Sequence, residues 1–173
     1  MASAQPAAYA AGRLFDDNFL KILPTPLREP RRAWLAIPAG WALSIVGSLL
    51  LAALFATVLP QLKGPDFPMK GWGALFALVV FAPVLETLIM AGLIWLLERF
   101  LPTTGAIVAS AIAWGAFHSL QALGWGLVIW WPFLIFSTLY VVWRQRGFWT
   151  AVGVAASTHA LQNLGPGLVI AFG

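Results

Sequence analysis

Three side chains capable of acid–base chemistry lie inside long apolar stretches of this chain. Glu86 stands in PVLETLIMAG (83–92), His118 ends WGAFH, and His159 begins HALQN, which ends at Asn163. A carboxylate or an imidazole can activate a water molecule, and imidazole and amide N–H groups can stabilise an oxyanion. Together these residue types support acid–base chemistry such as hydrolysis by an activated water molecule.

The composition places these residues in a membrane protein. The chain has 173 residues, of which 61% are hydrophobic and 9% are charged. A soluble domain averages about 25% charged residues. The charges gather at the ends of long apolar blocks, as they do in multispanning membrane proteins. The absence of Cys excludes disulfides, thiolate metal sites and a cysteine nucleophile.

The chain divides into a short amino-terminal segment and a helical membrane domain. Residues 1–33 are expected to be cytoplasmic, and within them 13–23 (RLFDDNFLKIL) predicts an amphipathic helix lying in the membrane interface. Its apolar face would contain Leu14, Phe15, Phe19 and Ile22, and the prolines at 24 and 26 would end it. Residues 34–173 form the predicted transmembrane domain.

Hydropathy predicts an all-α bundle of about five transmembrane helices in this domain. The expected spans cover residues 34–62, 72–97, 105–123, 125–143 and 148–164. The Gly-Pro-Gly sequence at 165–167 predicts a break or kink in the last helix.

The basic residues predict which side of the membrane each end faces. If the amino terminus is inside, seven basic residues besides Arg13 lie at the cytoplasmic ends, and the far side holds only two, Lys63 and Lys70. The seven are Lys21, Arg28, Arg31, Arg32, Arg99, Arg144 and Arg146. This asymmetry predicts a cytoplasmic amino terminus, and the small size suggests a bacterial inner membrane protein. The net charge of +4 is then assigned to contact with membrane lipids, not to nucleic acid.

The polar residues of the spans fall at similar depths. Glu86 and His159 would each lie about 16 Å from the cytoplasmic face, because an α-helix rises about 1.5 Å per residue. His118 would lie about 20 Å deep and Asn163 about 22 Å deep by the same rise. Three helices would thus bring a carboxylate and both histidines of the chain close to the middle of the bilayer.

A purely structural interpretation of each residue is also open. A glutamate at the centre of a spanning helix costs about 2.5–3.5 kcal/mol, which a salt bridge could offset. No Lys or Arg lies within a span, so a protonated Glu86 would have to bond to a neighbouring helix instead. Either histidine alone could make an interhelical hydrogen bond worth about 0.6–2 kcal/mol. The common depth of all three favours a functional site.

The three stretches resemble the motifs of the CPBP family of intramembrane proteases. This family includes the CAAX prenyl endopeptidases and bacteriocin-processing or Abi proteins, and its members carry EExxxR, FxxxH and HxxxN or HxxxD on successive helices. Glu86 matches the first glutamate, and His118 matches the second motif with Trp in place of Phe. His159 and Asn163 match the third motif fully, and the resemblance covers about residues 72–164.

The first motif departs from the family pattern at two positions. Thr87 stands where the second glutamate would be and Ala91 where the arginine would be. These positions are one helical turn apart, the spacing of an ion pair, so their joint loss leaves no unpaired charge. We interpret the missing pair as an orienting element, for which the Thr87 hydroxyl substitutes. The alternative is a catalytically silent member of the family.

The resemblance implies an endopeptidase, for which we expect no cofactor. Glu86, helped by His118, would activate the water, and His159 with Asn163 would face the oxyanion. A zinc site formed by Glu86, His118 and His159 is the alternative, since two histidines and one glutamate are a catalytic zinc ligand set. That set would leave no titratable group as general base, which favours the metal-free mechanism.

Several partners and two other functions remain compatible with the sequence. The substrate would be a prenylated CAAX protein, a leader peptide, or a membrane protein cut near its anchor. A silent member would act as an assembly or immunity partner in a membrane complex, which the residues at 87 and 91 favour. A proton or ion relay is the second rival. The absence of sequence repeats argues against it, because transporters are usually built from repeats.

Overall fold

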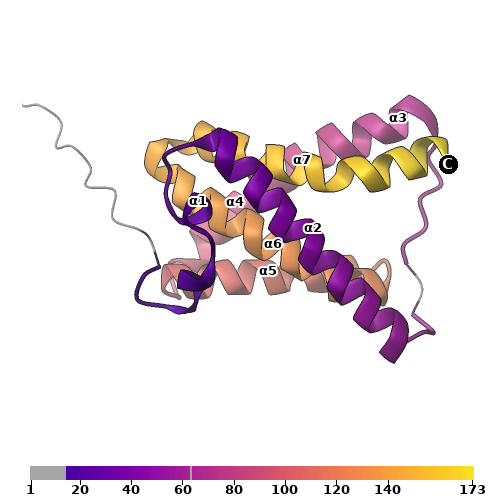
Figure 1. The fold of residues 1–173 in the computed structure, drawn as a ribbon, viewed down its shortest axis with the longest axis horizontal. Coiled ribbons are helices and arrows are strands. Elements are labelled where there is room, and N and C mark those ends of the chain that lie inside the picture. The colour runs from indigo at the N-terminus through magenta and orange to yellow at the C-terminus, as the bar shows by residue number, and fades with distance from the viewer. Residues whose placement is uncertain (1–14, 63) are drawn as a thin grey trace, which may run out of the picture.

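The structure is a computed structural model that describes residues 15–62 and 64–173, and over these residues its regular secondary structure is all helical (Figure 1). The long helices are α2 (Ala33–Val58), α5 (Thr103–Ser119), α6 (Leu123–Trp143) and α7 (Phe148–Phe172). Between α2 and α5, one continuous helical segment consists of α3 (Gly71–Phe76), the π-helix η2 (Ala77–Phe81) and α4 (Ala82–Leu97). The expected all-α fold is therefore correct for the described residues.

Three helical segments are long and apolar enough to cross a membrane. They are Ala33–Val58, Gly71–Leu97 and Leu123–Arg146. The two other expected spans correspond to α5, which has 17 residues, and α7, which is long but carries the polar side chains of the HALQN motif. Length and composition thus support a helical membrane protein with three candidate spans.

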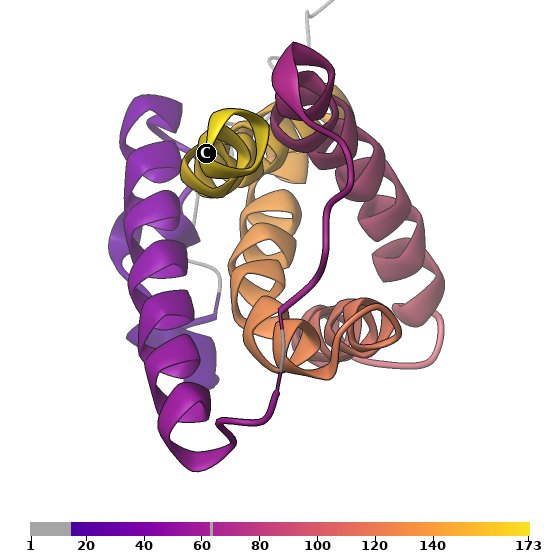
Figure 2. The ribbon, with the colours of Figure 1, turned by 90° about the vertical axis from the view of Figure 1, so that its right-hand side faces the viewer.

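Helix α6 forms the centre of the bundle. It packs against α2, α4, α5 and α7, and Figure 2 shows it between α2 and α4, with α7 above and α5 below. Every residue from Phe133 to Trp143 is buried. A helix that is apolar all round is stable in such a position because each of its faces meets another helix.

Of the break or kink expected at the Gly-Pro-Gly sequence, the break does not occur. Helix α7 continues through Pro166 to Phe172. This part of the helix packs against α3 and η2, and a Cβ atom on Gly167 would lie 2.9 Å from the Val79 side chain. Close packing against a neighbouring helix stabilises the turn that the missing proline N–H weakens.

The amino-terminal segment does not form the expected α-helix over its described part. Arg13 and Leu14 lie outside the described residues, and the rest forms a turn followed by the 3₁₀-helix η1 (Phe19–Ile22) and α1 (Thr25–Arg28). Two residues of the predicted apolar face, Phe19 and Ile22, are exposed, and its contact with the membrane interface stays a prediction. The buried side chains are instead Phe15, Leu20, Leu23 and Leu27. The tighter winding of a 3₁₀-helix changes which residues share a face.

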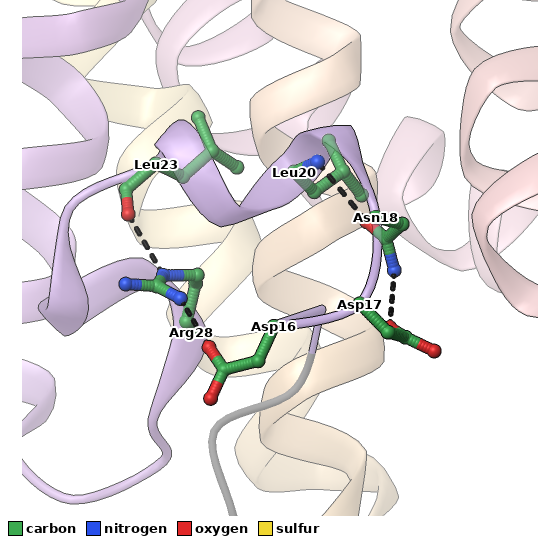
Figure 3. A network of polar contacts seen from close by, with 6 residues as sticks. All are labelled: Asp16, Asp17, Asn18, Leu20, Leu23 and Arg28. Carbon is green, nitrogen blue, oxygen red and sulfur yellow. Dashed lines mark hydrogen bonds and ion pairs between the residues drawn. The ribbon is translucent and has the colours of Figure 1, made fainter.

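A buried arginine joins this segment together (Figure 3). Arg28 donates from Nε to the Leu23 carbonyl at 2.8 Å and from a terminal nitrogen to Asp16 at 2.6 Å. Asn18 accepts the Leu20 N–H at the start of η1. Because buried charge is tolerated only when it is paired, these bonds let the segment pack against α2 and α6.

A second ion pair joins the ends of two helices. Arg144 directly follows α6, and Glu98 directly follows α4. Both terminal nitrogens of Arg144 donate to the Glu98 carboxylate, at 2.6 Å each. These hydrogen bonds hold the pKa of the Glu98 carboxyl below its ordinary value. The bidentate geometry aligns α4 with the central helix, so Glu86 and the α6 aromatic residues have a defined separation.

Candidate active site

All four residues singled out in the sequence line one cavity. Glu86 on α4, His118 on α5, and His159 and Asn163 on α7 border a space of about 240 Å³. The cavity is otherwise mainly apolar, and none of the described lysines or arginines lines it. Its remaining walls come from Pro65, Phe67, Leu78, Ala82, Trp125, Ile129, Phe133, Gln162, Pro166, Gly167 and Ile170.

Glu86 faces His159 across the cavity. Glu86 Oε2 lies 3.7 Å from His159 Nε2, which is longer than a direct hydrogen bond and short enough for one water molecule to contact both atoms. The His159 ring is buried and stacks on Phe136 with a centroid distance of 4.6 Å. Its Nδ1 has no hydrogen-bond partner among the residues the structure describes. The imidazole edge that faces Glu86 is therefore the one available for polar contacts.

The orientation of His118 is set by its own helix. Its Nδ1 lies 2.8 Å from the Trp114 carbonyl oxygen, one turn earlier on α5. A carbonyl can only accept, so Nδ1 carries the proton and the neutral ring keeps Nε2 as its acceptor. The edge-to-face contact with Trp125, at 4.4 Å, holds the ring plane. His118 can thus accept a hydrogen bond from water in the cavity.

Phe133 lies against both histidine rings. Its ring centroid is 5.6 Å from that of His118 and 5.4 Å from that of His159, and it stacks on Trp114 at 4.4 Å.

Within 15–62 and 64–173, no three His, Asp or Glu side chains are grouped so as to hold a metal ion. Binding of zinc by Glu86 and the two histidines would require these side chains to move closer together.

The side-chain amide of Asn163 already makes one hydrogen bond, to the backbone of η2. Its Nδ2 donates to the Leu78 carbonyl, in η2, at 2.9 Å. The second N–H of the same amide group is left for a contact within the cavity. A single π-helical turn inside a longer helix is frequent at functional sites, and here it precedes Glu86 by one helical turn.

The structure corrects the interpretation of Thr87 and adds a residue to the site. Thr87 is 1% exposed, its hydroxyl has no partner in the described part of the chain, and it does not line the cavity. Its hydroxyl therefore does not substitute for a carboxylate.

Gln162 does line the cavity and donates to Ser48 of α2 at 3.3 Å. Its place within HALQN, as a further polar residue in an apolar helix, was the available sequence signal.

Comparison of the chain with family models, curated proteins and solved structures finds no match. The resemblance to the CPBP family therefore depends on the three motifs alone. The function has to be argued from the cavity and from the side chains that line it.

Proposed function

We propose that this protein is an intramembrane endopeptidase that hydrolyses a peptide bond in a membrane-associated protein or peptide. The observation that carries the proposal is the 3.7 Å separation of Glu86 and His159 in a cavity that His118 also lines. No described cation lies in that cavity to explain Glu86 as half of a structural ion pair. A carboxylate held in an apolar cavity beside two imidazoles is suited to proton transfer.

The reaction needs one water molecule and no other reactant. Glu86, with the His118 Nε2 acceptor orienting the water, takes one proton as the water oxygen attacks the peptide carbonyl carbon. The oxyanion accepts a hydrogen bond from His159 Nε2–H. Glu86 then gives its proton to the amide nitrogen, the C–N bond breaks, and a carboxylic acid and an amine are released.

The finer architecture belongs to the same proposal. We place the amino terminus in the cytoplasm of a bacterial cell and count five membrane crossings, with α5 and α7 as the two additional spans. The order of the three motifs supports membership of the CPBP family. Membrane lipids and a protein or peptide substrate are the partners, and no cofactor is required.

A catalytically silent assembly or immunity partner is the second candidate. The buried state of Thr87 and Ala91 favours it, because neither position offers the motif's charged pair. An arginine at position 91 would enter the apolar core, where Met90 and Ile94 are also buried. Such a protein would bind its partner whether or not Glu86 can transfer a proton.

The test is a comparison of protein termini in host membranes that contain wild type, Glu86→Gln or Asp17→Asn. We expect a new terminus with wild type and with Asp17→Asn, because Asp17 is exposed and lies outside the cavity. Glu86→Gln and His118→Ala should remove it while the protein stays folded and inserted. Identical termini in all samples, with a partner retained by Glu86→Gln, would establish the silent alternative.

Loss of processing with a chelator, restored by zinc, would establish the zinc mechanism.

A further inference from the structure

One backbone carbonyl of η2 has lost both of its possible helical donors. In an α-helix the Leu78 carbonyl would accept from Ala82, but the Ala82 N–H donates to Ala77. In a continued π-helix it would accept from residue 83, which is Pro83 and has no N–H. A carbonyl in an apolar environment without a donor is costly, so this oxygen needs a partner from outside its own helix.

Helix α7 supplies that partner. Asn163 Nδ2 donates to the Leu78 oxygen at 2.9 Å. One turn further along α7, a Cβ atom on Gly167 would lie 2.9 Å from Val79 Cγ2, so only glycine allows this approach without movement of the valine. A side-chain hydrogen bond and a close backbone contact therefore hold α7 against η2 at adjacent turns.

This contact lies next to the catalytic carboxylate. Ala82, the first residue of α4, and Glu86, one turn later, both line the cavity with Asn163. A shift of η2 away from α7 would move the start of α4 and would change the separation of Glu86 from His159. The bond from Asn163 thus acts on the part of the backbone that leads into Glu86.

We propose that Asn163 is a positioning residue: it binds the carbonyl that Pro83 leaves without a donor and thereby holds Glu86 opposite His159. The catalytic consequence rests on the proposed function, whereas the hydrogen bond and its effect on Glu86 do not. The competing role is direct donation to the oxyanion, in which the Leu78 contact is incidental.

The two roles differ in how they respond to a change at Pro83. Asn163→Leu keeps the number of side-chain atoms and removes the donor. Pro83→Ala restores an N–H five residues after Leu78, so the carbonyl regains a partner in its own helix. Gln162→Leu is the matched control, because the neighbouring Gln162 bonds to Ser48 on α2 and not to η2.

Two readouts need no substrate: the midpoint of thermal unfolding in detergent, and the rate at which dicyclohexylcarbodiimide modifies Glu86, followed by mass spectrometry. We expect Asn163→Leu to lower the midpoint by several degrees and to change the modification rate severalfold. The double variant with Pro83→Ala should return both toward wild type. Pro83→Ala should not rescue Gln162→Leu. If Asn163→Leu alone fails to fold, folding of the double variant is the same supporting result.

Processing of the substrate completes the test. Recovery of processing in the double variant supports positioning. A double variant that keeps the defects of Asn163→Leu overturns the proposal. A double variant that recovers stability and Glu86 modification but does not recover processing also overturns it, because the Asn163 amide would then be needed in the reaction itself. If wild type processes nothing, the proposed function fails, while the two substrate-free readouts still decide the role of the hydrogen bond.

Discussion

The buried polar side chains of this protein differ in whether the fold provides them with a partner. Ser137 donates to Ser110, and Thr138 donates to the Leu134 carbonyl. In the part of the chain that the structure describes, atoms of Thr87 and His159 are buried without a partner. The unpartnered atom of His159 is Nδ1, whereas its Nε2 faces Glu86 in the cavity, where water or substrate can contact it. Thr87 does not line the cavity, so its hydroxyl is expected to contribute nothing to stability or to catalysis.

We therefore predict that Thr87→Val leaves processing intact and leaves the free energy of unfolding unchanged or raised by about 1 kcal/mol, because it replaces an unpaired hydroxyl with a methyl group. Ser110→Ala is the contrasting variant, since it removes the acceptor of the Ser137 hydroxyl. It should cost about 1–3 kcal/mol. Thermal unfolding of both variants in detergent measures the difference. A loss of processing in Thr87→Val would restore a catalytic role for its hydroxyl.

At the level of helices, the site depends on a very close approach between α5 and α6. A Cβ atom on Gly126 would overlap the Ser119 side chain and the Gly115 carbonyl oxygen. Small residues at such a crossing let two backbones pack closely, which is a common source of stability between membrane helices. Helix α5 carries His118, and α6 carries Trp125 and Phe133, which contact its ring. The same close approach therefore assembles the aromatic wall of the cavity.

Gly126→Ala should separate α5 from α6 and destabilise the protein by about 1–3 kcal/mol, the usual cost of overpacking. It should also reduce processing, because the contacts of His118 with α6 would be lost. Gly92→Ala on α4 is the matched control, since a Cβ atom there meets nothing within 4 Å. That variant should be neutral or stabilising by up to about 1 kcal/mol, because alanine is the better helix former. Equal unfolding midpoints for the two variants would contradict the proposed packing role.

At the scale of the whole molecule, the number of membrane crossings decides on which side of the membrane the connection between α6 and α7 lies. With five crossings, Gln145 in this connection is on the same side as Asp17, opposite Lys70. With only the three most apolar segments crossing, Gln145 is on the side of Lys70. All three residues are exposed, and the chain contains no Cys. Single cysteine variants can therefore be made without removing any native thiol.

We predict that, in intact bacterial cells, a membrane-impermeant maleimide labels Lys70→Cys and does not label Asp17→Cys or Gln145→Cys. The latter two should react only after the membrane is opened. This result follows from five crossings with the amino terminus inside, as the distribution of basic residues favours. Labelling of Gln145→Cys from outside would reduce the number of crossings to three.

The sequence by itself determined the class of protein, the approximate helices and the candidate residues of the site. In hydrocarbon, backbone groups must bond within helices and buried polar side chains are costly, so both leave a pattern along one chain that can be read directly. Glu86, His118, His159 and Asn163 were predicted in this way, and the structure brings them to one cavity. Their catalytic roles remain proposals.

Only the tertiary structure decided how these residues are held. The bond from Asn163 to Leu78, the position of Phe133 against both histidines, and the burial of Thr87 away from the cavity are interactions between helices. The continuation of α7 past Pro166 likewise depends on packing against η2. Local sequence patterns report the conformation and polarity of one segment. Contacts between segments distant in sequence depend on how the helices pack, and that packing locates the donors and acceptors of the site.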